Sequence, residues 1–358
     1  MKNSNIQYRV TTMLIIIASV AILLLGGMLH LGIRPYTPSW PEGTSAAEEG
    51  IAELQPVDIN GSRQWLLIRG ADRSKPVLLW LHGGPGAAQM PLAHALPPEL
   101  EKHFVVVHWD QRGAGKSNTR DLDEQTLNPE QFLDDALEVI SYLLATLQQE
   151  QIWLLGHSWG TRLGIELIQR HPELFHGYVG VSQVADHRKA VELATMVLRK
   201  KLDETENHNA LKKLERLNNP ALYHADYRTL VGMIDNHCAD YAPSTLELAR
   251  VALKAPEYCF RDYLRLWRGV QRGGNPMHRN GIMEPFSYLN DTLHTSVPVY
   301  LIAGQHDLNT PLKLTRELYH KINAPEKELI VFETSGHLPF FTEKERFAQV
   351  MMRIAGTK

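Results

Sequence analysis

Short apolar runs recur along the chain and predict the strands of a buried sheet. Each run is only four or five residues long. Nearly uninterrupted apolar sequence of this length is typical of strands that are covered on both faces of a parallel sheet. The predicted strands are Val77–Leu81, Phe104–His108, Gln151–Leu155, Tyr178–Val181, Val299–Ala303 and Glu328–Phe332.

Segments with apolar residues at helical spacing separate or follow these strands. The sequence Asn128-Pro129-Glu130-Gln131 predicts a helix start, with Asn128 as the cap and proline at the first helical position. Further helices are expected over Leu312–Ile322 and Lys344–Ile354. Because strands and helices alternate, we expect an α/β fold with a mostly parallel sheet flanked by helices.

The strand pattern disappears in one long internal stretch, residues 185–285, which is rich in Leu, Tyr, Arg and His at helical spacing. We interpret this stretch as a helical cap inserted above the sheet. The expected organisation is therefore an N-terminal anchor, a linker, a first core segment, the cap and a second core segment. Their ranges are 1–34, 35–50, 51–184, 185–285 and 286–358.

The N-terminal region contains a long uncharged segment. Residues 10–33 hold no Asp, Glu, Lys or Arg, and a helix of this length spans about 36 Å, enough for a hydrocarbon core of ~30 Å. A cleaved signal peptide is the alternative, but its apolar region is usually ~7–15 residues and ends in an A-x-A-like site. We therefore expect an uncleaved single-pass anchor. Lys2 and Arg9 precede it and only Arg34 follows closely, which favours a cytoplasmic N-terminus and an extracytoplasmic catalytic domain.

Composition excludes several classes of protein. The 358 residues carry 37 Lys and Arg against 40 Asp and Glu, a net charge of −3, so nothing indicates a nucleic-acid partner. Two cysteines exclude a disulfide-rich scaffold, and the lack of CxxC and HExxH patterns gives no reason to expect a metal or cofactor. Cys238 and Cys259 both fall in the predicted cap, as a disulfide or as two separate thiols. The oligomeric state is left open.

The candidate nucleophile is Ser158, within Gly156-His157-Ser158-Trp159-Gly160. This G-x-S-x-G sequence directly follows a predicted strand and precedes a helical run, which is the context of a nucleophile elbow. The sharp turn exposes the serine hydroxyl above the sheet, at the positive end of the following helix. The alternative is a tight turn that carries an ordinary serine.

A serine nucleophile requires a base and an acid that orients it, in the chain order Ser, Asp or Glu, His. Asp307 follows the strand Val299–Ala303, and His337 follows the strand Glu328–Phe332. Both are therefore expected at the same edge of the sheet as Ser158. The competing candidates, less well placed in chain order or position, are His82, His157, His306 and Asp291.

An acyl-transfer enzyme also needs donors for the developing oxyanion. We expect these to be the backbone N–H groups of Trp159, directly after the serine, and of Gly84, in the sequence His82-Gly83-Gly84-Pro85-Gly86 after the first buried strand. A phosphate-binding loop is the alternative for this glycine-rich turn. The sequence Gly115-Lys116-Ser117 also resembles the end of a nucleotide-binding loop, but the required glycine is replaced by Asp110.

Together, HGGPG at 82–86, DQRGAGKS at 110–117, GHSWG at 156–160 and the late Asp and His resemble the prolyl aminopeptidase (proline iminopeptidase) family of α/β-hydrolases. The resemblance implies a triad of Ser158, Asp307 and His337, an oxyanion hole of Gly84 and Trp159, and a DQRG segment packed beneath the site.

Two features depart from this family. The family's elbow commonly reads GGSWG, whereas this chain has His157 at the second position. The family also tends to carry a Trp-Glu pair in the cap, whose glutamate binds the substrate amine. The most similar sequence here is Leu266-Trp267-Arg268-Gly269, with arginine in place of glutamate. The other cap carboxylates that are available for an amine are Glu204, Glu206, Asp226, Asp235, Asp240, Glu247, Glu257 and Asp262.

Three functions follow as hypotheses. The first is a membrane-anchored serine aminopeptidase that acts on small peptides through an acyl-enzyme. The second is a carboxylic-ester or lipid-related hydrolase with the same triad. The third is a non-catalytic binding protein on this scaffold, which the full set of candidate triad and oxyanion residues disfavours.

Overall fold

A computed structural model describes residues 35–219, 224–238, 241–272 and 286–356, together with positions 19, 20, 23 and 26. The expected membrane helix over residues 10–33 therefore lies outside the described residues, apart from those four positions. Within the described part of the chain, no helix is both long enough and apolar enough to cross a membrane.

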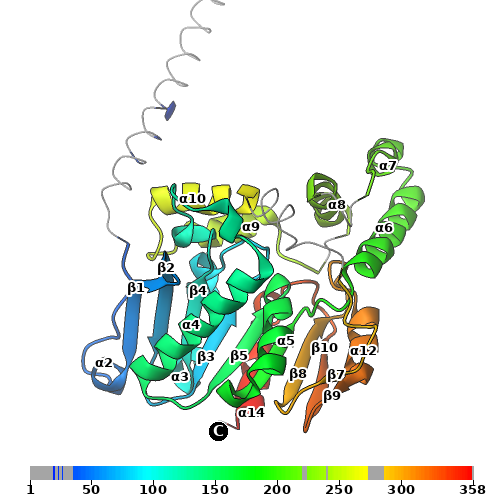
Figure 1. Ribbon diagram of the computed structural model, residues 1–358. Coiled ribbons are helices and arrows are strands. Elements are labelled where there is room, and N and C mark those ends of the chain that lie inside the picture. Colours follow the sequence, from blue (N-terminus) through cyan, green and yellow to red (C-terminus); the bar gives the residue numbers. More distant parts are fainter. Residues whose placement is uncertain are drawn as a thin grey trace, which may run out of the picture.

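One eight-stranded sheet forms the centre of the molecule, in the order β1-β2-β4-β3-β5-β6-β8-β10 (Figure 1). All pairings from β4 to β10 are parallel, whereas β1–β2 and β2–β4 are antiparallel. A separate two-stranded pair joins β7, Leu293–His294, to β9, Ile322–Asn323. The strands of the main sheet are β1 Ile51–Ile59, β2 Ser62–Gly70, β3 Val77–Leu81, β4 Val105–Asp110, β5 Ile152–His157, β6 Phe175–Val181, β8 Val299–Gly304 and β10 Lys327–Phe332.

The six predicted strands are confirmed, with ends that differ by at most three residues. The antiparallel hairpin β1–β2 was not predicted. Its turn is Asn60-Gly61, and both residues have positive φ, 47° and 69°. Asn-Gly is a strong signal for a two-residue hairpin turn, because both positions must adopt left-handed conformations that strain most other residues. The hairpin was therefore recognisable from this dipeptide.

Helices cover both faces of the sheet. On one face pack α4 (Pro129–Leu147), α5 (Trp159–Arg170) and α12 (Leu312–Lys321), and on the other α3 (Glu99–His103) and α14 (Lys344–Ile354). The predicted helix start is confirmed, because the side chain of Asn128 accepts a hydrogen bond from the backbone N–H of Gln131 at 3.0 Å. The short helices are α2 Ser45–Glu49, α13 Pro339–Thr342, η1 Met90–Ala95, η2 Gly115–Ser117, η3 Glu124–Thr126 and η4 Pro172–Leu174.

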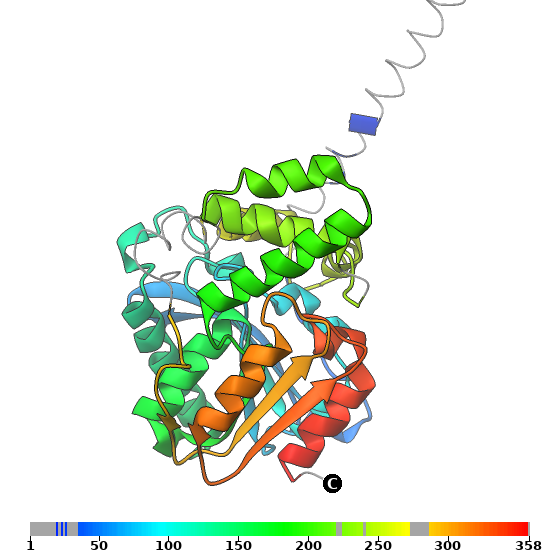
Figure 2. The same cartoon turned by 90° about the vertical axis from the view of Figure 1, so that its right-hand side faces the viewer.

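In the described part of the segment between β6 and β8, five helices lie above the carboxyl ends of the central strands (Figure 2). They are α6 His187–Glu204, α7 His208–Glu215, α8 His224–His237, α9 Thr245–Ala252 and α10 Phe260–Arg272. The first three pack around an apolar cluster of their own, whereas α10 lies on η2 and on the neighbouring core. The described residues from 187 to 272 contain no strand. The domain limits at residues 185 and 285 stay predictions.

The two cap cysteines do not form a disulfide. Cys238 lies beside the α6–α8 cluster, and Cys259 is buried just before α10, where its thiol contacts a carboxylate oxygen of Asp262 at 3.2 Å. Of the two arrangements left open by the sequence, the structure contains two separate thiols.

The predicted linker, residues 35–50, lies against the folded domain. The backbone N–H of Tyr36 donates to the carbonyl of Pro256, just before α10, at 3.1 Å. The guanidinium of Arg69 donates to the carbonyl of Pro38 at 2.6 Å and lies 5.1 Å from the centre of the Trp40 ring. This segment is thus fixed to both the core and the cap.

Candidate active site

Ser158 occupies a strained turn between β5 and α5. Its φ of 51° and ψ of −118° lie in a region that residues with a side chain rarely adopt. The flanking glycines permit this turn: a Cβ on Gly160 would lie 2.2 Å from the carbonyl oxygen of Leu81, and one on Gly156 would lie 2.7 Å from that of Gly160. Backbone bonds also hold the turn, including Ser158 N–H to Val181 O at 3.0 Å. The sequence and the strain both single out this serine.

Asp307 and His337 meet at the same edge of the sheet, each in the loop that follows its strand, β8 or β10. Nδ1 of His337 lies 2.8 Å from Oδ2 of Asp307. The carboxylate is buried and accepts hydrogen bonds from the backbone N–H groups of Asn309 and Thr310, at 2.8 Å and 2.9 Å, and from the Thr310 hydroxyl. These bonds fix the carboxylate, which in turn orients the imidazole.

The Asp307–His337 pair shifts the pKa of both members. Burial disfavours a charge on His337, but the attraction and the hydrogen bond of Asp307, with a smaller contribution from Asp235, outweigh it and raise the pKa of His337 above its ordinary value. Burial likewise opposes ionisation of Asp307, but His337 and Thr310 keep its pKa below the ordinary value. Asp307 is therefore a stable carboxylate, and His337 is suited to accept a proton.

His157 supports the backbone of His337. The Nε2 atom of His157 lies 3.0 Å from the carbonyl oxygen of His337, which also accepts from the Ser182 hydroxyl at 3.0 Å. Its ring packs edge-on against Phe340, with the centroids 4.9 Å apart. Burial lowers the pKa of His157 to about 3, so its ring is neutral and Nε2–H is the donor. The residue that departs from the family pattern thus positions the loop of the candidate base.

The competing candidates have other surroundings. Burial lowers the pKa of His82 to about 4, and its Nε2 accepts from the backbone N–H of Gln111 at 3.2 Å. The ring of His306 is stacked on Tyr241 with centroids 3.6 Å apart. Asp291 is exposed and precedes β8, which begins at the opposite edge of the sheet from His337. Of the candidate bases and acids, the structure brings His337 and Asp307 together in one hydrogen bond.

The HGGPG loop passes directly beside Ser158. A Cβ on Gly83 would lie 3.2 Å from the Cβ of Ser158, so the next peptide N–H, that of Gly84, belongs to the loop that borders the serine. Among the residues that the structure describes, the backbone N–H groups of Gly84 and Trp159 have no hydrogen-bond acceptor. Two unpaired N–H groups beside a serine are the donors that an oxyanion requires.

Gln111 joins this loop to the elbow. Its side-chain NH2 donates to the carbonyl of His82 at 3.1 Å, and its side-chain oxygen accepts from the indole N–H of Trp159 at 3.4 Å. Gln111 therefore fixes the spacing between the two segments that carry the candidate oxyanion donors. The family resemblance indicated only that the DQRG segment packs beneath the site, and this bridging role was missed.

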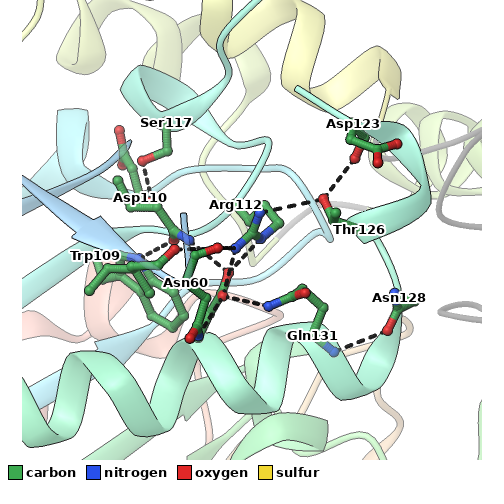
Figure 3. A network of polar contacts seen from close by, with 12 residues as sticks. Asn60, Trp109, Asp110, Arg112, Ser117, Asp123, Thr126, Asn128 and Gln131 are labelled. Carbon is green, nitrogen blue, oxygen red and sulfur yellow. Dashed lines mark hydrogen bonds and ion pairs between the residues drawn. The ribbon is translucent and has the colours of Figure 1, made fainter. Parts of the chain in front are cut away.

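Arg112, the next residue, is held in the core by a buried ion pair with Asp135 of α4. Figure 3 shows Arg112 within its network of polar contacts, with Asn60 and Gln131 nearby. Its Nε and Nη2 atoms contact the two carboxylate oxygens at 2.6 Å and 2.8 Å. Gln64 and Gln131 also donate to this carboxylate, at 2.7 Å and 3.0 Å. Because every charged group has partners, the network fixes the loop beneath the site to β2 and α4.

Lys116 connects the core to the cap. Its ammonium group is fully buried, 2.7 Å from a carboxylate oxygen of Asp262 and 2.9 Å from the carbonyl of Glu257, and it also lies over the rings of Trp65 and Tyr258. The GKS sequence that resembles a nucleotide-binding loop thus holds α10. No phosphate-binding role is available to a lysine with this set of partners.

One of the cap carboxylates proposed from the sequence lies beside His337. Asp235 of α8 lines the same small recess as Asp307 and His337. Burial raises its pKa, although His337 acts in the opposite direction. The other described cap carboxylates have other roles. Asp262 pairs with Lys116, Glu204 pairs with Lys200, and Asp226 accepts hydrogen bonds from two backbone N–H groups. Glu247 caps α9, Glu206 is exposed and Glu257 is buried beneath the linker. Asp240 lies outside the described residues.

The sheet order, the turn after β5 and the pair at the ends of β8 and β10 define an alpha/beta hydrolase. The chain belongs to the alpha/beta hydrolase fold family, whose model matches residues 76–344. It is 31% identical over 313 residues to the "Probable aminopeptidase YbaC" of Bacillus subtilis (strain 168), covering 86% of this chain and 98% of that protein.

Other relatives agree with the resemblance seen in the sequence. The proline iminopeptidase of Clostridium botulinum is 26% identical over 282 residues, covering 77% of this chain and 88% of that protein. The crystal structure of proline iminopeptidase from Mycobacterium smegmatis has the same fold, with a TM-score of 0.61 and 23% identity over 85% of this chain and 98% of that one. The similarity to the prolyl aminopeptidase family is confirmed.

Proposed function

We propose that this protein is a serine aminopeptidase that removes N-terminal residues from small peptides through an acyl-enzyme. The observation that carries the proposal is the Asp307–His337 hydrogen bond at the sheet edge where Ser158 occupies a strained turn. In the proposed reaction, His337 takes the Ser158 proton as the hydroxyl oxygen attacks the scissile carbonyl, and later delivers that proton to the leaving amine. A water molecule, activated by the same imidazole, then hydrolyses the ester and restores Ser158.

Stabilisation of the tetrahedral intermediate is assigned to the N–H groups of Gly84 and Trp159. Both lie in segments that Gln111 connects, so the donors are held in place before the substrate binds. Preorganised donors of this kind need no rearrangement as negative charge develops on the substrate oxygen, and removal of one such donor typically costs about 10²–10³ in kcat.

A peptidase is favoured over an esterase by the position of Asp235. A substrate with a free N-terminus carries its ammonium group one residue or less from the scissile carbonyl, and Asp235 shares a recess with the candidate base. A carboxylate there offers the ammonium group a partner of opposite charge, whereas a neutral ester has no use for it. The names of the relatives point to the same class of substrate.

We further propose that residues 10–33 anchor the chain in a membrane, with the N-terminus in the cytoplasm and the hydrolase domain outside. The support is the length of the uncharged segment and the excess of positive charge before it. A reporter fused after Lys358 of the full chain tests the orientation, since activity of a cytoplasmic reporter at that position contradicts it.

A substrate panel on the full chain in detergent tests the enzymatic proposal. We expect hydrolysis of aminoacyl-naphthylamides to exceed that of short acyl esters, and Ser158→Ala to abolish both activities together with labelling by a fluorophosphonate. Ser74→Ala, a serine bonded only to Asp72 at the surface, is the matched control and keeps both. A Ser158→Ala protein that still turns over contradicts the mechanism, and preferred hydrolysis of esters favours the second hypothesis.

Asp235→Asn tests the specificity. We expect KM for the aminoacyl substrate to rise by about tenfold, on the order of one charge-assisted hydrogen bond, with little change in KM for a neutral ester. An equal effect on both substrates shows that Asp235 does not bind the amine.

A further inference from the structure

The solvent-facing side of α10 is unusual for a surface helix. Phe260, Leu264 and Trp267 are exposed by 41%, 42% and 62%, and they share one helical stripe because they are separated by four and three residues. The opposite side carries Asp262 and Gly269, which face the core. Tyr263 and Leu266 of the same helix pack against the core, so α10 is apolar on its exposed side as well as on its buried side.

Arginines accompany the apolar stripe. Arg261 and Arg268 are exposed on the same side of α10, and with Arg265 of the helix and Arg120 of the neighbouring loop they line a recess of about 530 Å³. Arg265 pairs with Asp262. In the described part of the chain, no carboxylate pairs with Arg120, Arg261 or Arg268, so this recess presents net positive charge.

A helix that exposes Trp, Phe and Leu beside Arg has the composition of helices that lie in the plane of a bilayer interface. Such helices bury the apolar side chains among the acyl chains and place the arginines at the level of anionic headgroups. Exposed apolar and basic residues in one stripe thus fit a lipid surface that combines a hydrophobic acyl region with anionic headgroups.

The linker fixes the position of this helix relative to the proposed anchor. Tyr36 is bonded to Pro256, four residues before α10 begins. The uncharged segment ends at residue 33, and three residues span about 10 Å at most. If the anchor crosses the membrane and residue 33 lies at its surface, Tyr36 and its partner Pro256 therefore lie within roughly that distance of the surface. Helix α10 begins four residues after Pro256.

We propose that the exposed side of α10 docks onto an anionic lipid bilayer and holds the hydrolase domain with its cap against the membrane. This inference rests on the anchor proposed above, but not on the catalytic mechanism. The occupant is the headgroup layer of anionic phospholipid: the apolar stripe enters the interface, and Arg120, Arg261 and Arg268 contact phosphate groups. The active site is then held close to the membrane surface.

The test uses the full chain in nanodiscs of phosphatidylcholine with 0% or about 30% phosphatidylglycerol. Lipids brominated near the headgroup quench tryptophan that enters the interface. The quenching of Trp267 is measured as the difference in fluorescence quenching between the wild type and Trp267→Phe. We expect this quenching to increase at least twofold with phosphatidylglycerol and to decrease in 0.5 M salt.

Charge variants separate docking from general attraction. Arg120→Gln/Arg261→Gln/Arg268→Gln is expected to remove most of the Trp267 quenching, because each arginine near an anionic surface contributes a factor of about five to the equilibrium. The matched control is Lys200→Gln/Lys212→Gln/Lys213→Gln, which removes three exposed charges from α6 and α7 and is expected to leave the quenching unchanged. Equal melting temperatures in detergent show that both variants are folded.

Each failure has a separate signature. If the chain stays bound to neutral nanodiscs at high salt, the result supports the membrane anchor. If the chain is released, the result contradicts the anchor and, with it, the expected closeness of Pro256 to the membrane. Two results overturn the docking of α10 without affecting the anchor. In the first, the chain stays bound but Trp267 is not quenched. In the second, Trp267 is quenched equally with and without phosphatidylglycerol and with and without the three arginines. A soluble acidic peptide that prevents quenching of Trp267 by the brominated lipid identifies a protein partner, and this result also overturns the docking of α10 onto lipid.

Discussion

The imidazole of His157 is hydrogen-bonded to the backbone carbonyl of His337, with Nε2 and the oxygen 3.0 Å apart. The immediate neighbour of the candidate nucleophile along the chain thereby supports the loop of the candidate base, 180 residues away. Glycine, common at this position in the related family, has no side chain that could make this bond.

His157→Ala is therefore expected to lower kcat by about 10- to 100-fold, because a displacement of the base by less than 1 Å weakens proton transfer. His320→Gln, an exposed histidine, is the control and should have no effect. Since burial keeps His157 neutral, with a pKa of about 3, the acid limb of the pH profile should keep its midpoint in a His157→Gln variant. A shifted midpoint would make His157 the titrating base.

The pH dependence of kcat/KM follows from His337. Neutral imidazole is the active form, and Asp307 holds the pKa of His337 above its ordinary value of about 6.5, so activity is expected to be lost as pH falls through a midpoint above that value. Asp235→Asn removes a smaller favourable charge, and the midpoint should move to lower pH. Asp307→Asn should reduce kcat by about 10⁴-fold. Unchanged kcat in Asp307→Asn would assign the acid elsewhere.

The buried pair of Arg112 and Asp135 is expected to control stability. Asp135→Ala leaves an uncompensated guanidinium in the core and should lower the free energy of unfolding by about 3–5 kcal/mol. Glu130→Ala breaks an exposed ion pair with Arg170 and should cost at most about 1 kcal/mol. Denaturant titration of the full chain in detergent, followed by tryptophan fluorescence, measures both. Equal losses would show that the Arg112 network is not a structural element.

Lys116→Met is expected to loosen the cap. The variant leaves the buried carboxylate of Asp262 without its ammonium partner and removes the bond to the Glu257 carbonyl. Limited proteolysis should cut the segment 253–272 faster than in the wild type, while the 187–215 helices, which have their own apolar cluster, keep their rate. Lys102→Met, at an exposed lysine, is the control. A uniform increase over the whole chain would indicate global unfolding instead.

Much of the site was predictable because parallel strands deliver their following loops to one edge. Ser158, Asp307 and His337 could be placed by strand order alone, and the hairpin signal at Asn60-Gly61 was present but not used. By contrast, the role of Gln111 depends on contacts with residues 29 and 48 positions away. Nothing in local periodicity encodes such pairings.

The sequence could not indicate which cap carboxylate lies beside the candidate active site, for a different reason. Carboxylates on amphipathic helices have the same sequence surroundings whether they cap a helix, as Glu247 does, pair with a buried lysine, as Asp262 does, or face the site, as Asp235 does. Only packing separates these cases. The contacts of Tyr36 and Arg69 in the linker region could not be predicted either, because a proline-rich sequence indicates a stiff segment but not the residues against which it packs.

The apolar cluster of α6, α7 and α8 is separate from the clusters on the two faces of the sheet, although Tyr227 and Leu308 also pack against it. Asp235 belongs to a helix whose core residues, such as Leu230 and Met233, pack within that cluster, whereas Asp307 and His337 depend on the sheet. Substitutions inside the cluster can therefore shift α8 and alter which substrates enter, without replacing any residue of the sheet that carries Asp307 and His337. A scaffold built in this way is a natural starting point for directed evolution of substrate range, with mutations confined to residues 187–238.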